Sequence, residues 1–364
     1  MKIGEIIQHL ELWAPPSLQE SYDNSGLILG DKNDECHSAL ITLDVTEEVI
    51  NEAIAQKNNL IIAHHPIIFK GLKKIGKKHW IDKCIRKAIK NDISIYAIHT
   101  NLDNIHTGVN KKICDMIGLT NLEALQPKPG TLAKLTVFVP QESKEEVLSA
   151  LFEAGAGNIG NYDQCSFQLT GSGTFRGNEH SKPKVGNQGI KEIVEETRIE
   201  VVIRKHDLVK VLNSMKKSHP YEEVAYYVSD LLNQNQEIGS GMVGSLTHEM
   251  KPADFLNSLK SKMNLNTIKH TTFCKSTISR VAVCGGSGSF LLNAAMAKQA
   301  DIFITADFKY HEFFEANSDI IIVDIGHYES EVYTKDLLND ELTKTFANFA
   351  FHLSKVDTNP IKYL

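Results

Sequence analysis

The chain has 364 residues, a formal net charge of −6, 42% hydrophobic residues and 23% charged residues. This length predicts two or three domains with a large buried core, and the acidic balance disfavours nucleic acid as the main partner, since phosphate contacts require clustered lysine and arginine. No run approaches the about 20 apolar residues of a membrane span, and the start lacks the layout of a secretory signal. We therefore expect a cytoplasmic protein without a membrane partner.

The first part of the chain alternates predicted helices and strands. The apolar pattern predicts a helix at 2–13, strands at 39–43, 60–63 and 93–98, and helices after Thr46, around 81–89 and at 109–118. These strands end in Asp44, His64-His65 and His99. A β-α-β-α-β alternation predicts a largely parallel sheet with its site at the carboxyl ends of the strands.

The composition of the sequence changes at Gln126–Gly130, where two prolines and a glycine indicate a linker. Beyond it, the predicted elements are strands at 132–140, 164–169, 200–204 and 224–228 and helices at 142–155 and 207–217. Their order, β-α-β-β-α-β, is that of a ferredoxin-like unit. Past Gly239–Gly241 the α/β alternation returns, with strands at 278–284, 301–305 and 320–324.

We therefore predict a discontinuous three-layer α/β core. Its halves, 1–127 and 241–364, are interrupted by an inserted ferredoxin-like (α+β) domain at 128–240.

The feature with the clearest chemistry is the apolar run 60–63 that ends in His64-His65-Pro66. Because Pro66 cannot continue a central strand, two imidazoles are presented at the carboxyl end of a buried strand. Successive strand residues point to opposite faces. If both histidines serve one site, either the chain turns at this point or the site holds two metal ions.

Three further residues complete a candidate ligand set. Asp103 follows the strand after the histidines, and His327 and Glu331 have the spacing that puts an imidazole and a carboxylate on one helical face. Five ligands exceed the four of tetrahedral zinc and suit two divalent ions bridged by a carboxylate. We predict that His64 and His65 bind different ions and that Asp103 bridges them. The alternative is that these residues cap helices and close turns.

Other chemistry is indicated less strongly. Gly285–Ser289 follows a strand and resembles a phosphate-cradling turn, but it has neither the Walker nor the GxGxxG spacing, and a tight βα turn explains it. No GxSxG nucleophile elbow is present, and the six cysteines lack metal-ligand or nucleophile spacing. The lysine pairs Lys73-Lys74 and Lys77-Lys78 either attract an anionic substrate or form a solvated loop.

Six motifs together resemble one protein family. They are Asp23–Gly26, Thr42–Thr46, Ala63–Pro66, His99–Asp103, Asp307–His311 and Gly326–Glu331. In this order they are similar to the family named GTP cyclohydrolase 1 type 2 homologues, also called the Ngg-interacting-factor-3-like family. The resemblance spans both outer segments, and the insertion matches the long Gram-positive branch of the family.

The resemblance implies a di-metal site and a toroidal homohexamer with the metal sites facing its interior. The implied ligands are His64, His65, Asp103, His327 and Glu331, the same set that the residues themselves suggested. Matching family positions near the site are His99, Asp44, Asp307 and His311. The inserted domain resembles the signalling protein P-two and divalent-cation-tolerance proteins, and His219–Glu223 matches that domain's own motif.

Two functions are compatible with these patterns. The first is a metal-dependent hydrolase of an anionic nucleotide or phosphoester, in which two divalent ions activate water and His99 or Asp307 moves the proton. Zinc is the first expectation, and iron, manganese or nickel also suit these ligands. The family name points to GTP, although no pattern in the chain indicates recognition of guanine. The second function is a non-catalytic metal-binding or regulatory ring whose inserted domain senses a small molecule or docks a partner.

Overall fold

The structure is a computed structural model that describes residues 1–364 and divides into two compact units. The core unit comprises Met1–Pro127 and Gln236–Leu364, and the inserted unit comprises Lys128–Asn235. The inserted unit ends before residue 240, the predicted boundary, because strand β10 (Gly239–Met250) already belongs to the core unit.

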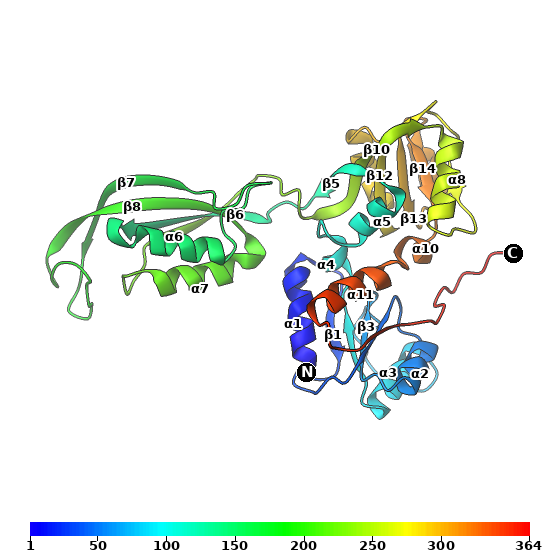
Figure 1. Ribbon diagram of the computed structural model, residues 1–364, viewed down its shortest axis with the longest axis horizontal. Coiled ribbons are helices and arrows are strands. Elements are labelled where there is room, and N and C mark those ends of the chain that lie inside the picture. Colours follow the sequence, from blue (N-terminus) through cyan, green and yellow to red (C-terminus); the bar gives the residue numbers. More distant parts are fainter. The chain divides into compact units, whose positions relative to one another are not determined.

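The first half of the core unit forms a five-stranded sheet (Figure 1). In spatial order its strands are β1 (Gly26–Leu29), β4 (Ser94–Ala97), β3 (Leu60–Ala63), β2 (Ala39–Thr42) and β15 (Phe351–Leu353). Only β1 runs antiparallel to its neighbour. Strands β2, β3 and β4 are buried along their whole length, as expected for parallel strands covered on both faces.

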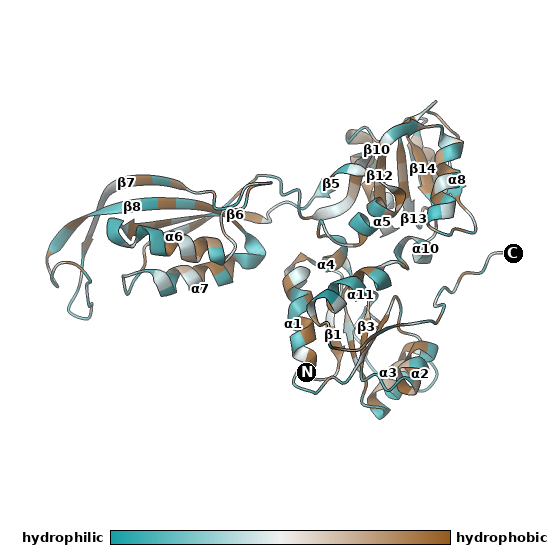
Figure 2. Ribbon diagram, in the orientation of Figure 1, coloured by the Kyte–Doolittle hydropathy of each residue, from teal (hydrophilic) through white to brown (hydrophobic).

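Helices cover both faces of this sheet, which gives the three layers. One face, with Leu40 and Ile61, packs against α2 (Glu47–Ala55) and α3 (Trp80–Lys90). The other face, with Ile41 and Ile62, packs against α1 (Ile3–Trp13) and α11 (Thr334–Thr345). In Figure 2 the strands are coloured mostly hydrophobic, while the helices show both colours. The predicted α/β class is confirmed.

The second half forms a separate six-stranded sheet. Its order is β11 (Lys269–His270), β14 (Ile321–Asp324), β13 (Ile302–Ala306), β12 (Ile278–Ser287), β10 and β5 (Thr120–Pro127). Strands β12, β13 and β14 are parallel, and the others pair antiparallel. Helices α5 (Val109–Ile117) and α8 (Pro252–Lys262) pack on one face and α9 (Leu292–Ala297) on the other.

The two sheets exchange strands. Strand β15, from the second half of the chain, joins the first sheet, and β5, from the first half, joins the second. The sequence analysis missed β5, because it lies at a sheet edge and is buried only in part. No helix in the chain combines the length and the apolar character needed to cross a membrane.

The inserted unit has the predicted element order β-α-β-β-α-β. Strands β6 (Leu132–Pro140), β7 (Phe167–Arg176), β8 (Lys191–Arg204) and β9 (Tyr226–Asp230) form an antiparallel sheet in the order β7-β8-β6-β9, and the helices are α6 (Lys144–Glu153) and α7 (Leu208–Ser218). Both helices pack against the sheet in one apolar cluster. Strands β7 and β8 are longer than predicted because they pair as a largely exposed ribbon without a continuous apolar pattern.

Candidate metal centre

The candidate site lies in the core unit, where residues at the carboxyl ends of parallel strands from both sheets line one cavity of about 1040 Å³. From the first sheet come residues that follow β2, β3 and β4, among them Asp103 in the short helix α4 (Thr100–Asp103). From the second half come residues of β12 and of α10 (His327–Glu331). Open α/β sheets place ligand sites at this end of their strands.

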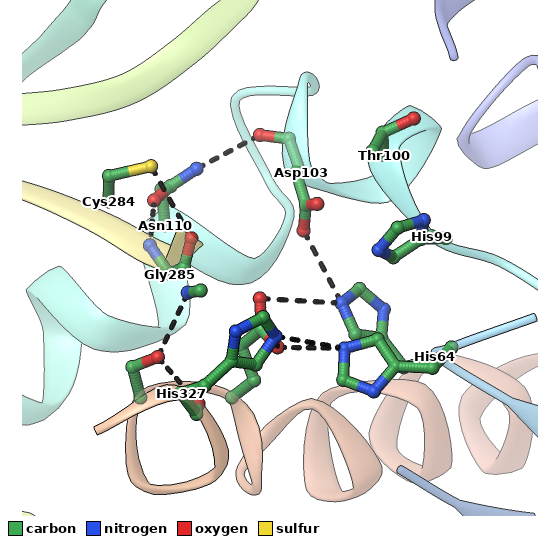
Figure 3. A network of polar contacts seen from close by, with 12 residues as sticks. His64, His99, Thr100, Asp103, Asn110, Cys284, Gly285 and His327 are labelled. Carbon is green, nitrogen blue, oxygen red and sulfur yellow. Dashed lines mark hydrogen bonds and ion pairs between the residues drawn. The ribbon is translucent and has the colours of Figure 1, made fainter. Parts of the chain in front are cut away.

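His64 is fully buried and held from one side of its ring. Its Nδ1–H donates to the carbonyl oxygen of Ile98 at 2.8 Å, which leaves Nε2 3.6 Å from Asp103 Oδ1 (Figure 3). Both atoms are buried, and neither has a hydrogen-bond partner. Buried polar atoms without partners are costly. The gap between this imidazole nitrogen and this carboxylate oxygen therefore fits a cation that both would bind.

Glu331 brings the remaining imidazoles together. Its Oε2 lies 2.9 Å from His65 Nε2 and 3.0 Å from His327 Nε2, and its Oε1 lies 3.9 Å from His64 Nε2. Helix α10 begins at His327 directly after Gly326, so the predicted helix with His327 and Glu331 on one face is confirmed. One carboxylate thus faces three histidines.

A separate aspartate holds the outer ring nitrogen of His65 and of His327. His65 Nδ1–H donates to Asp44 Oδ1 at 2.7 Å, and His327 Nδ1–H donates to Asp307 Oδ2 at 2.7 Å. Such pairs fix the tautomer and orientation of a metal-binding histidine. Asp307 has a left-handed backbone with φ of 60°, which is uncommon outside glycine and concentrates at functional sites.

The carboxylates set the protonation of this cluster. Burial alone would lower the pKa of His65, but hydrogen bonds with Asp44 and Glu331 outweigh it and raise the pKa to about 10. Burial and the negative charge of Glu331 raise the pKa of Asp103 to about 7. Burial opposes ionisation of Glu331 as well, yet its hydrogen bonds with the histidines hold its pKa well below the usual range. A cation would replace protons here and relieve the repulsion between the two carboxylates.

His99 stands beside the candidate ligands and is held by Asp23. Its Nδ1–H donates to Asp23 Oδ1 at 2.8 Å, and its ring centroid lies 5.2 Å from that of His64 and 5.3 Å from that of His65. Burial opposes ionisation of Asp23, but hydrogen bonds with His99 and Thr100 outweigh it and lower the pKa. From the sequence, Asp23 had no role beyond its place in the motif Asp23–Gly26, because His99 lies far away along the chain.

The glycine-rich turn supports the site by its lack of side chains. A Cβ atom on Gly286, whose φ is +61°, would lie 2.3 Å from Glu331 Oε1. Asn110 links the neighbouring elements, because Gly285 N donates to its Oδ1 at 3.0 Å and its Nδ2 donates to the carbonyl oxygen of Asp103 at 3.0 Å (Figure 3). The glycines therefore leave room for the Glu331 carboxylate. This role is compatible with a tight βα turn and requires no bound phosphate.

The sequence-predicted residues are not all at the site. Side chains that lie close enough to hold one ion form three overlapping groups: His64, Asp103 and Glu331; His65, His327 and Glu331; and His64, His65 and His99. The first two groups put His64 and His65 with different partners and share Glu331, which favours Glu331 over Asp103 as the bridge. His311 is exposed and lies against Tyr310 and Phe314 rather than along the cavity.

Comparisons with known proteins agree with the resemblance. A family model described as Duf34/NIF3 (NGG1p interacting factor 3) matches residues 1–360. The chain is 39% identical over 373 residues to the GTP cyclohydrolase 1 type 2 homolog of Halalkalibacterium halodurans, with 100% of both chains covered. It is 38% identical over 366 residues to the protein of the same name from Bacillus subtilis, with 99% of this chain and 98% of the relative covered.

The crystal structure of a Bacillus cereus protein related to NIF3 is similar along the whole chain. It has a TM-score of 0.88 at 39% identity, and the match covers 100% of this chain and 99% of that chain. The family prediction is confirmed: this chain belongs to the Duf34/NIF3 family.

Proposed function

We propose that the chain binds two divalent metal ions and hydrolyses a small anionic molecule at them. The first ion is held by His64, Asp103 and Glu331, and the second by His65, His327 and Glu331, with Glu331 as the shared ligand. Zinc suits these imidazoles and carboxylates, as do iron, manganese and nickel. The observation that carries the proposal is the buried pair His64 Nε2 and Asp103 Oδ1, which face one another without a hydrogen-bond partner.

The chain's own residues support proton transfer next to this pair. Bound divalent ions supply Lewis-acid polarisation and make a water more acidic. Because its Nδ1–H is bonded to Asp23, His99 presents Nε2 as a proton acceptor beside His64 and His65. Asp307 was the other predicted proton carrier. The hydrogen bond between Asp307 and His327 supports a role for Asp307 in orienting that histidine. We therefore assign the proton transfer to His99.

The side chains that line the cavity favour a substrate with an anionic group and a flat apolar part. Phe69, Trp80 and Phe290 line the cavity with rings that are each about half exposed or more, and the Phe69 ring lies 5.4 Å from that of His99. Lys70 and Lys73 line the same cavity and form no ion pair within the chain. Lysine ammonium groups attract phosphate or carboxylate, and aromatic faces stack on planar groups.

The test is turnover by purified protein loaded with zinc, manganese, iron or nickel. Substrates should include GTP, other nucleotides and aryl phosphoesters, because the relatives' name points to GTP and the cavity wall to any aromatic anion. We expect His64→Ala/His65→Ala to abolish turnover and His37→Ala, at an exposed histidine, to leave it unchanged. Equal turnover by the wild type and the double variant would reject the hydrolase and leave a non-catalytic metal-binding protein.

Two further parts of the proposal rest on family membership. We propose that the chain assembles into a toroidal homohexamer in the cytoplasm, with the metal sites towards its interior. Size-exclusion chromatography with light scattering of the purified protein tests the assembly, and a monomer at micromolar concentration would contradict it.

A further inference from the structure

We propose that the C-terminal segment 354–360 is a clamp that positions the metal centre, with Thr358 as a positioning residue for His65. This inference rests on the proposed metal binding but not on hydrolysis. Thr358 and Pro360 line the cavity of the candidate site, and neither was singled out by any sequence motif.

The path of the chain explains why this segment reaches the site. Strand β15 pairs parallel with β2, with Leu353 opposite Ile41, and Ser354 N continues the pairing by donating to Ile41 O at 2.8 Å. Two parallel strands leave the sheet at the same edge. Residues that follow β15 therefore lie beside Asp44, which follows β2.

The segment is anchored before it reaches the site. Ser354 Oγ donates to Glu52 Oε2 at 2.6 Å, and Lys355 N donates to Glu52 Oε1 at 2.9 Å. Val356 packs against the apolar cluster that includes α2 and α3. These contacts fix the direction in which Thr358 is presented.

Thr358 contacts the carboxylate that holds His65. Its Oγ1–H donates to Asp44 Oδ2 at 2.6 Å, while Asp44 Oδ1 accepts from His65 Nδ1 at 2.7 Å. The two oxygens of Asp44 are thus bonded to two different groups, which fixes the rotation of the carboxylate. The orientation of His65 depends on Asp44, and that of Asp44 on Thr358.

The next residues contact the other half of the site. Asn359 Nδ2 donates to Glu329 Oε1 at 2.9 Å, and burial and the charge of Asp357 raise the pKa of Tyr328 to about 12. Glu329 and Tyr328 belong to α10, which carries His327 and Glu331. Two consecutive residues, Thr358 and Asn359, therefore hold Asp44 from the first sheet and α10 from the second half of the core unit. Such outer contacts maintain the ligand spacing that a metal ion requires.

The experiment compares metal affinity and the Co²⁺ absorption spectrum of the full chain and three variants. Thr358→Val removes the hydroxyl while keeping the side-chain shape, Thr358→Ser restores the hydroxyl, and Thr247→Val is the matched control at an exposed threonine of β10. Affinity is measured for Co²⁺ by competition with a chromophoric chelator.

We expect Thr358→Val to weaken Co²⁺ binding roughly 10-fold, the lower end of what is typical for lost outer contacts, and to change the d–d bands. Thr358→Ser should restore both, and Thr247→Val should change neither. The midpoint of thermal unfolding in chelator should fall slightly for Thr358→Val, because one hydrogen bond to the Asp44 carboxylate is lost, and it should recover in Thr358→Ser, so the spectrum and the return of affinity in Thr358→Ser report the metal centre itself.

Asn359→Ala tests the contact with α10 independently and should also weaken Co²⁺ binding. Unchanged affinity and spectrum in both Thr358→Val and Asn359→Ala would overturn the clamp while leaving the metal centre intact. If the wild type binds no Co²⁺, both the clamp and the proposed metal centre are wrong.

Discussion

His64 Nε2 and Asp103 Oδ1 lie 3.6 Å apart, both buried and both without a hydrogen-bond partner. They come from neighbouring parallel strands, because His64 follows β3 and Asp103 lies in the short helix after β4. A hydrogen-bonded pair would be closer, and a repelled pair would be solvated. The spacing leaves room for a cation bound by both atoms, as the proposed metal centre requires.

The first prediction concerns metal removal. Zn²⁺ at a hundredfold excess over its Kd should stabilise the chain by about 2.7 kcal/mol for each of the two proposed sites, and chelator should reverse the effect. Calorimetry of the wild type with and without Zn²⁺ measures this. His64→Ala removes a ligand of one ion only and should lose about half of this response, and a rise in the midpoint equal to that of the wild type would show that the ion binds elsewhere.

The second prediction concerns the orienting carboxylate of His327. Asp307→Asn keeps the side-chain shape but removes the charge that fixes the Nδ1–H tautomer, so metal affinity should fall about 10- to 100-fold. Titration calorimetry with Zn²⁺ is the measurement. Asp319→Asn, at an exposed aspartate nearby in the sequence, should bind like the wild type. An unaffected Asp307→Asn would mean that the hydrogen bond to His327 has no part in metal binding.

The third prediction concerns the room made by a glycine. Gly286→Ala places a Cβ 2.3 Å from Glu331 Oε1 at a φ of +61°, so it should displace Glu331 and weaken metal binding. Gly130→Ala is the control for backbone strain alone, since its φ is +68° and nothing lies within 4 Å of the added Cβ. Gly130→Ala should lose about 1–2 kcal/mol of stability from strain, Gly286→Ala should lose more because of the clash, and only Gly286→Ala should lose metal affinity.

The fourth prediction concerns pH and the inserted unit. His219 Nε2–H donates to Phe138 O at 2.9 Å, and Nδ1 accepts from Tyr221 N at 3.1 Å. Burial lowers the pKa of His219, so the unfolded chain binds a proton at a higher pH than the folded chain does. The contribution of His219 to stability is therefore complete above about pH 6.5, the ordinary value for histidine, and is lost as the pH falls below it.

Calorimetry of the full chain between pH 7.5 and 5.5 checks this. His219→Gln should reduce the pH dependence of unfolding, and His180→Gln, at an exposed histidine of the inserted unit, should leave it as in the wild type. An identical pH dependence in all three proteins would rule out a buried neutral His219.

The parts that the sequence predicted well are those with a local pattern. The buried strands before Asp44, His64 and His99 are short apolar runs that stop at polar residues, and the helix at His327 begins at a glycine with positive φ. Each can be inferred from a few neighbouring residues. That is why the candidate ligands could be collected before any contact between them was known.

The parts that the sequence did not predict depend on distant partners. Asp23 belongs to the site only because the fold brings it to His99, and Thr358 only because β15 pairs with β2. Strand β5 has a mixed exposure pattern, so its pairing with β10 decides its conformation. The preference for Glu331 as the bridging residue is likewise a matter of distances, since both carboxylates have the same chemistry.

The exchange of β5 and β15 between the two sheets has a consequence for biosynthesis. The inserted unit can complete its sheet from consecutive residues while the rest of the chain is still on the ribosome. The first sheet of the core unit must wait for residues 351–353, which follow every strand of the second sheet along the chain. The candidate metal centre, which needs residues from both sheets, should therefore be completed only after this strand has been made.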